Sequence, residues 1–185
     1  MQRNLVTVIR RRRYFFNSGE PNYLDLRGTN LREANFEGAN FQGANLKWTY
    51  LGGANFKEAN LQEAIFKKAN LQDAFLAGVY LRGAFLTDAN LQRANLAGAD
   101  FRKAFLYSSN LQEAYLGMTD FERAHFAGAN LEGADFIGAN LINADGLTVD
   151  QLSKAKTLSS AKIDEDLLIP LREKYPDILN FRPEY

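Results

Sequence analysis

The sequence predicts an all-β solenoid, a four-sided β-helix of about six coils with a C-terminal α-helical cap. Two features lead to this prediction: an uninterrupted five-residue repeat, and the end of that repeat at Asp145. The chain has 185 residues, of which 46% are hydrophobic. A chain of this size can form one domain with a sizeable core.

The repeat places Leu or Phe at every fifth residue from Leu26 to Leu141, which makes 24 repeat centres. The residue two places before each centre is Ala in 18 of the 24 units, and the residue directly before it is mostly Asn or Asp. A helix repeats its face about every 3.6 residues and a strand every two, so neither explains this period. The first ten centres are Leu26, Leu31, Phe36, Phe41, Leu46, Leu51, Phe56, Leu61, Phe66 and Leu71.

A square cross-section accounts for a period of five. Each side of the square is one unit, each corner is a tight turn, and the large and small apolar residues of the unit point inward. Four units then make a coil, and coils stack like neighbouring strands, about 4.8 Å apart. Ten of the 14 Gly lie two residues after a centre, where a turn residue with positive φ is expected. All four Pro lie outside the repeat, where no ladder hydrogen bond is lost.

Stretches such as "NLQEAIFKKANLQDAFL" and "NLQRANLAGADF" resemble the units of pentapeptide-repeat proteins. The resemblance covers about residues 24–145 and implies a right-handed quadrilateral β-helix. It implies little about function, because most members of that family have none assigned. The C-terminal tail also resembles the ends of pentapeptide-repeat proteins that are abundant in cyanobacteria.

The chain divides into three parts: an N-terminal basic segment or cap over 1–23, the β-helix over 24–145, and a helical cap over 146–185. A stack of coils exposes strand edges at its ends, and these edges need covering. The stretch "GLTVDQLSKAKT" predicts a helix, with Thr148 as N-cap and Gln151 at the capping-box spacing.

A second helix is expected in "IDEDLLIPLREKYP", beginning near Asp164 and stopped by Pro176. Pro170 lies inside this stretch, where proline either kinks a helix or ends an early turn. Both helices are expected to form a lid on the last coil.

Four units per coil sort the outward positions into faces by residue number modulo 20. On the face that we call the first face, the residues directly before the centres are Asp25, Asn45, Ile65, Phe85, Phe105, His125 and Asp145. An exposed apolar stripe there would indicate an interface, in which aromatic residues are favoured anchors. The candidate interaction face comprises Trp48, Ile65, Phe85, Phe105, Tyr107 and His125.

Four roles for this stripe remain open at this point. It could bind an unknown protein partner, join two copies of the chain as a homodimer, or be covered by the N-terminal "LVTVI…YFF" segment. It could also be tolerated as exposed surface.

Two further faces have readable patterns. One face carries an Asn column in which amide ladders are expected to stabilise the stack: Asn70, Asn90, Asn110 and Asn130. Another gathers basic residues with carboxylates interleaved, which indicates a solvated mixed surface: Arg82, Arg102, Lys103 and Arg123.

The sequence offers no recognisable catalytic chemistry. It has no Cys, its one histidine is His125, and its carboxylates have neither metal-ligand spacing nor an opposed acid–base arrangement. A shaft filled with Leu, Phe and Ala leaves no cleft for a substrate. We therefore expect a non-enzyme with no cofactor, no metal and no small-molecule substrate, which acts as a scaffold for protein–protein interaction or self-association.

Charge suggests two alternatives of another class. Residues 1–23 hold five Arg and one Glu, net +4, whereas residues 24–145 hold 11 basic and 14 acidic residues, net −3. Some members of the resembled family mimic duplex DNA and bind type II topoisomerases, but mimicry needs a strongly negative rod, so the sequence disfavours this role. The candidate basic segment that could touch an anionic membrane or an acidic partner is Arg10, Arg11, Arg12 and Arg13.

The formal net charge of the whole chain is zero, which gives no indication of a nucleic-acid partner. The pattern contains neither a signal peptide nor an apolar run of the ~20 residues that a membrane helix needs. A cytoplasmic protein is expected, without a membrane partner.

Overall fold

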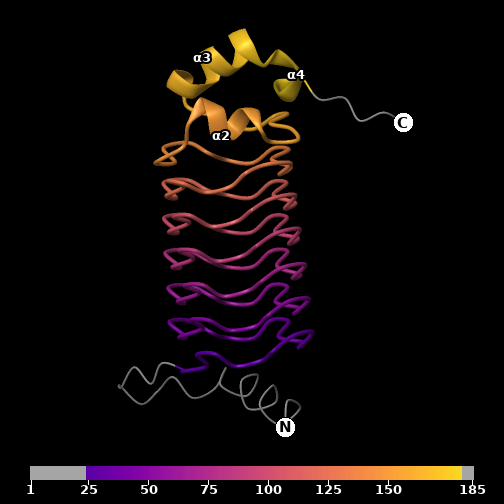
Figure 1. The fold of residues 1–185 in the computed structure, drawn as a ribbon, viewed down its shortest axis with the longest axis vertical. Coiled ribbons are helices and arrows are strands. Elements are labelled where there is room, and N and C mark those ends of the chain that lie inside the picture. The colour runs from indigo at the N-terminus through magenta and orange to yellow at the C-terminus, as the bar shows by residue number, and fades with distance from the viewer. Residues whose placement is uncertain (1–23, 181–185) are drawn as a thin grey trace, which may run out of the picture.

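The computed structural model describes residues 24–180. They form a four-sided shaft of stacked coils, closed at its C-terminal end by three short helices, α2 (Val149–Ser153), α3 (Glu165–Lys174) and α4 (Pro176–Leu179) (Figure 1). The predicted basic segment with Arg10, Arg11, Arg12 and Arg13, and with it the possible N-terminal cover of the first face, lies outside the described residues.

Parallel bridges join each coil to the next with a constant offset of four repeat units. Ile65, for example, is bridged to Asn45 below it and to Phe85 above it. The amide of Ile65 donates to the Ala44 carbonyl, and the Ile65 carbonyl accepts from the Leu46 amide, each at 2.8 Å. Because one coil takes four units, with one unit on each side, the bridges confirm the predicted square coil.

The interior of the shaft holds all 24 repeat centres, none of them more than 5% exposed. Phenylalanine rings gather near both ends: the Phe36 ring lies 5.0 Å from those of Phe41 and Phe56, and the Phe121 ring lies 5.0 Å from that of Phe126. From Ala34 onward, the small residue of each unit, usually Ala, is buried beside them. Each buried Leu or Phe side chain contributes roughly 1.5–3 kcal/mol, which chain entropy largely offsets.

Every corner contains a residue with positive φ, two places after the centre. At ten of these 24 positions the residue is Gly, as expected, but at the other 14 it is not, and Glu58 and Lys68 are examples. A hydrogen bond within the turn, such as Ala59 N–H to the Phe56 carbonyl at 2.9 Å, closes each corner. The amide of Glu58 also donates to the Ala77 carbonyl of the next coil. These bonds hold non-glycine residues in a conformation that costs them about 1 kcal/mol each.

The β-helix continues past Asp145, where the sequence pattern placed its end. Thr157 and Lys162 are bridged to Asp135 and Asn140, with an offset two residues longer than that between the other coils. Leu158 and Ile163, which follow them, are buried as further centres. The five-residue pattern ends at Asp145, but the ladder continues: α2 takes the place of one side, adds two residues, and the chain then returns to the ladder.

The first predicted cap helix exists but is short. α2 begins after Thr148, whose hydroxyl accepts from the Gln151 amide at 3.1 Å, while the Gln151 side chain accepts from the Thr148 amide at 3.0 Å. This confirms the capping box. The Gln151 side chain also donates to the Ala129 carbonyl of the last full coil at 2.9 Å. α2 ends at Ser153, well before the end of "GLTVDQLSKAKT", because Thr157 is needed in the ladder.

The second predicted helix begins after Asp164 and ends before Pro176, as expected. Pro170 lies within α3, which continues through it for four more residues. Leu171 is fully buried and fixes α3 on the rest of the cap. α4 begins at Pro176, and the Ile178 carbonyl accepts from the Leu158 amide at 2.7 Å, so the cap also covers the outer edge of the ladder.

Candidate interaction surface

Side chains from four successive coils form a column on the first face: Ile65, Phe85, Phe105 and His125, which we call the first-face column. The rings of Phe85 and Phe105 stack with centroids 4.9 Å apart and planes 5° apart. Phe105 and His125 stack in the same way, at 4.9 Å and 6°. The separation equals the spacing of the coils, about 4.8 Å, so the backbone itself sets the rings in register.

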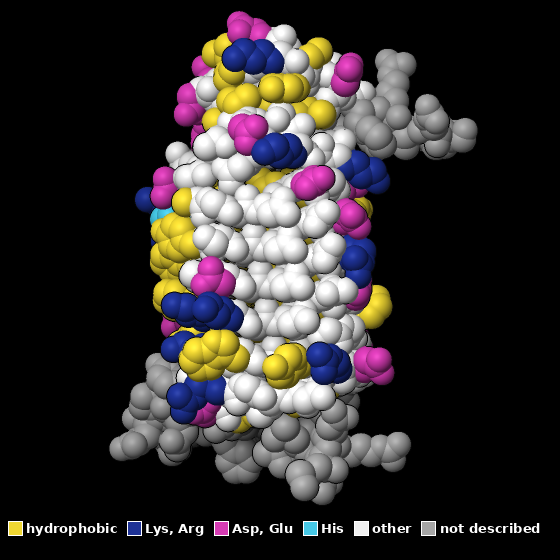
Figure 2. Space-filling view, viewed as in Figure 1, with side chains coloured by type: hydrophobic (Ala, Val, Ile, Leu, Met, Phe, Trp, Pro, Cys, Tyr) yellow, Lys and Arg dark blue, Asp and Glu magenta, His cyan; other side chains and the backbone are white. Residues whose placement is uncertain are grey.

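The column points outward. Phe85 is 43% exposed, and Ile65, Phe105 and His125 are half-buried. Figure 2 shows hydrophobic side chains gathered along one edge of the shaft, beside a broad face with few charges. A contiguous apolar strip of this kind differs from singly exposed apolar residues, which are normal on protein surfaces.

A shallow groove runs along one side of the column. Its floor is open because Gly43 and Gly83 have no side chains. The coils directly before and after that of Gly83 carry Glu63 and Lys103 at the same corner. The other lining residues belong to the column or continue it: Asn45, Ile65, Phe85 and Phe105. The groove is thus apolar on one side and carries one acidic and one basic side chain on the other.

The C-terminal end of the column is polar. The Nδ1 atom of His125 lies 3.1 Å from a carboxylate oxygen of Asp145 in the next coil. Tyr107 lies beside the column, with its ring centroid 5.7 Å from that of His125 and 6.1 Å from that of Phe105. The apolar part of the column is therefore centred on Phe85.

Trp48, a further residue of the candidate face, lies apart from the column. It occupies the corner toward the second face, with a positive φ of 57°, and lines a separate shallow groove with Asp25, Arg27 and Gly28. The sequence pattern placed Asp145 on the first face, but it did not identify Glu63 and Lys103 as neighbours of the column. Their spacing would have identified them, since each lies two residues before a column residue.

Most units differ from the column in having Asn or Asp at the outward position, for a local reason. The side-chain oxygen of Asn40, for example, accepts from the amide of Gln42 at 3.1 Å, which supports the turn that follows. Ile65, Phe85 and Phe105 have no such oxygen. The first face therefore gives up this hydrogen bond in three consecutive coils.

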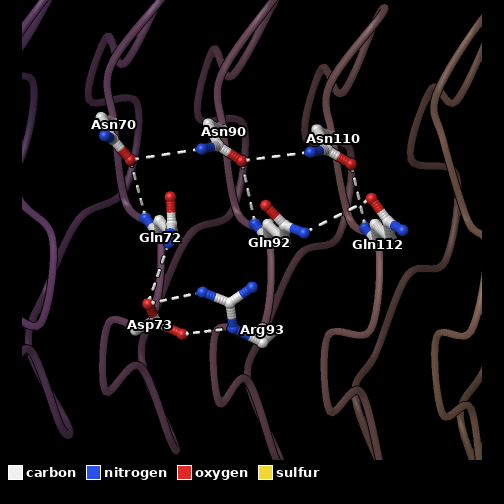
Figure 3. Close-up of polar contacts among 8 residues, drawn as sticks. All are labelled: Asn70, Gln72, Asp73, Asn90, Gln92, Arg93, Asn110 and Gln112. Atoms are coloured by element: carbon white, nitrogen blue, oxygen red, sulfur yellow. Dashed lines mark hydrogen bonds and ion pairs between the residues drawn. The ribbon is translucent and has the colours of Figure 1, made fainter.

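The second face carries the expected amide ladder (Figure 3). Asn90 donates to Asn70 at 3.3 Å and accepts from Asn110 at 3.3 Å, and Asn130 donates to Asn110 at 3.2 Å. Beside the ladder, the Arg93 guanidinium binds Asp73 at 2.8 Å and holds the pKa of that carboxyl below its usual value. This face is occupied with its own hydrogen bonds, which supports the structural role predicted for it.

The fourth face has its predicted mixed charge. Arg102 binds Asp100 through two hydrogen bonds of 2.8 and 2.7 Å and lies 3.7 Å from Asp120. Burial alone would raise the pKa of Asp100, but the side-chain and backbone hydrogen bonds from Arg102 together outweigh it and lower that pKa. The interleaved charges compensate one another, so this face has no strong field of one sign.

Within residues 24–180, no three His, Asp or Glu side chains are grouped so as to hold a metal ion. No helix in the same range has the length and hydropathy that crossing a membrane requires.

Comparison with known proteins agrees with this architecture. A family model for pentapeptide repeats matches the chain in eight copies, over residues 23–57, 39–76, 76–113 and 119–145. The curated proteins contain no significant match to the chain.

Solved structures with a similar fold are pentapeptide repeat proteins. Rfr23 from the cyanobacterium Cyanothece 51142 is 24% identical, with a TM-score of 0.50, over 76% of this chain and 91% of that one. A pentapeptide repeat protein from Nostoc Pcc 7120 is 31% identical, with a TM-score of 0.45, over 59% of this chain and 77% of that one. QnrB1, a plasmid-mediated fluoroquinolone resistance protein, is 20% identical, with a TM-score of 0.45, over 84% of this chain and 90% of that one.

Proposed function

This chain belongs to the pentapeptide-repeat family of right-handed quadrilateral β-helices, and we propose that it is a non-catalytic scaffold that binds protein through its first face. The observation that carries the proposal is the first-face column, in which an exposed Phe85 and a half-buried Phe105 stack on the outside of the shaft. Solenoid proteins use their extended surfaces for binding, and aromatic side chains are favoured anchors of such interfaces.

The rest of the described shaft supports the same choice. Its interior is filled by Leu, Phe and Ala, the second face bonds to itself, and the fourth face compensates its own charges. The mixed charge around Arg102 also argues against a DNA mimic, which would need a continuous negative surface. Exposed apolar side chains replace Asn singly elsewhere, as at Phe75, but the first-face column places three of them in consecutive coils.

A photo-crosslinking phenylalanine analogue placed at position 85 tests the proposal, with position 75 as the matched control. Phe75 also replaces the usual Asn and is 55% exposed, but it lies on another face. In extracts of the native cells, we expect position 85 to form protein adducts, either with a second copy of the chain or with another protein. A second change, Phe105→Glu, should remove these adducts. Equal adducts from positions 85 and 75, or none from position 85, would contradict the proposal.

A further inference from the structure

We propose that the partner of the first face is a second copy of this chain, bound face to face with the two shafts antiparallel and a two-fold axis beside Phe85. The inference rests on the proposed function and names its partner. It starts from the apolar part of the column, Ile65, Phe85 and Phe105, of which Phe85 is the middle residue. A two-fold axis at this coil sets Phe85 against its own copy and Ile65 against Phe105 of the second copy.

Charges along the groove corner support this arrangement. In successive coils the corner carries Gly43, Glu63, Gly83, Lys103 and Arg123. The sign of the charge thus changes across Gly83, in the same coil as Phe85. A reversed copy places Glu63 of each chain opposite Lys103 of the other, forms two equivalent ion pairs, and leaves Gly83 opposite Gly83, where backbones can approach closely.

The opposite flank of the column is compatible with the same axis. Its residues in successive coils are Lys47, Lys67, Thr87, Tyr107 and Ala127. A reversed copy sets Lys67 opposite the ring of Tyr107, a cation–aromatic contact, and Lys47 opposite Ala127. Thr87 lies in the coil of Phe85 and meets its own copy. No two like charges face each other within these two rows of residues.

Parallel shafts would give different contacts. In that arrangement Glu63 faces Lys67 and Lys103 faces Tyr107 of the second copy, so the Glu63–Lys103 pairs occur only with reversed shafts. The interface spans about five coils, roughly 24 Å at ~4.8 Å per coil, so we expect a reversible dimer with a micromolar dissociation constant.

Charge reversal at the corner tests the pairing by sedimentation equilibrium. Glu63 and Lys103 are exposed turn residues, so reversing them leaves the core intact, which circular dichroism verifies. Glu63→Lys alone and Lys103→Glu alone each place like charges opposite one another and raise the dissociation constant at least tenfold. An equimolar mixture of the two variants restores complementary pairs and forms heterodimers with affinity near that of the wild type. Arg123→Glu, whose residue faces Gly43, serves as the matched control and stays close to wild type.

The absence of Cys provides an independent test of the axis. Thr87→Cys meets its own copy and forms a disulfide-linked dimer on mild oxidation. Lys67→Cys lies two coils, about 10 Å, from its own copy and does not, because disulfides need Cβ atoms ~3.8 Å apart.

Three results would overturn the dimer: a monomeric wild type at 200 µM protein (about two hundred times a micromolar constant), no heterodimer from the two charge variants, or equal crosslinking of Thr87→Cys and Lys67→Cys. If position 85 nevertheless captures another protein in the photo-crosslinking experiment, the proposed function stands and the identity of the partner as a second copy falls. If position 85 captures nothing, both fall.

Discussion

Phe85 and Phe105, which are separated by four repeat units in the sequence, stack ring on ring in the structure with planes only 5° from parallel. The offset of one coil brings them together, and the spacing of the ladder sets their separation. Both residues stand where most repeat units place Asn or Asp, which would accept a hydrogen bond from the following turn. The protein thus combines a regular interior with one exposed column that departs from the regular exterior.

Loss of a core ring should be far more costly than loss of an exposed one. Phe56 is fully buried between Phe36 and Phe41, with ring centroids 5.0 and 5.4 Å away, whereas Phe75 is 55% exposed. We expect Phe56→Ala to lower the free energy of unfolding by about 3–5 kcal/mol and Phe75→Ala to lower it by less than about 1 kcal/mol. Urea denaturation followed by circular dichroism measures both. Similar losses from the two variants would show that the rings near Phe56 are not packed as described.

The amide ladder makes a separate contribution. Asn90→Ala removes hydrogen bonds to Asn70, Asn110 and the Gln92 amide. Asn95→Ala, on a face where Phe75 and Tyr115 flank it, removes the hydrogen bond with the Ala97 amide. At about 0.5–1.5 kcal/mol per hydrogen bond, we expect Asn90→Ala to be the more destabilising by about 1–2 kcal/mol. Equal urea midpoints for the two variants would mean that the ladder adds nothing to the turn.

Two glycines separate backbone conformation from available space. Gly98 has a φ of +63° and nothing within 4 Å of an added Cβ, so Gly98→Ala meets strain alone and should lower the free energy of unfolding by about 1 kcal/mol. Gly52 lacks a positive φ, and an added Cβ would lie 3.6 Å from the Gln72 carbonyl oxygen, an ordinary contact. Gly52→Ala should therefore be neutral or stabilise by up to about 1 kcal/mol. Calorimetric melting of both variants checks the sign, and a destabilising Gly52→Ala would refute this account.

The Asp100–Arg102 pair should make stability depend on pH in the acid range. The pKa of Asp100 is lower in the folded chain than in the unfolded one. Its contribution is therefore present above the unfolded pKa of about 3.9 and is lost as the pH falls through the folded pKa. Asp100→Asn keeps a side-chain oxygen for the Arg102 amide and removes the charge.

We expect Asp100→Asn to be less stable than the wild type at pH 7 by at most about 1 kcal/mol, because the Arg102 side chain is 42% exposed. The difference between their urea midpoints should shrink by pH 2.5. The exposed carboxylate of Asp88, changed to Asn, is the control. A difference that grows on acidification would have the wrong sign for this pair.

The fold could be read from the sequence because each unit repeats the same physical choice, with one large and one small residue inward. The first-face column followed from the same arithmetic, since the residue before each centre lies on a flat side. The position of Trp48 could not be predicted in this way. It occupies a corner, where the number of units per coil does not give the direction of a side chain.

The half coil after Asp145 was missed because it breaks the five-residue period. The buried Leu158 lies two residues beyond the position at which that period would place a centre above Phe136. Glu58 and Lys68 occupy the same place in the repeat as the corner glycines, but their residue types give no indication of a positive φ.

The most direct test of the central claim is the light-scattering mass of the wild type and of a Phe85→Glu, Phe105→Glu double variant, with circular dichroism of both. We predict a wild-type mass that approaches twice the 20.8 kDa of one chain as concentration rises, and a folded variant with the mass of a single chain. A variant that unfolds would show that these rings belong to the core. A folded variant with the same mass as the wild type at every concentration would show that the first-face column does not hold two copies together.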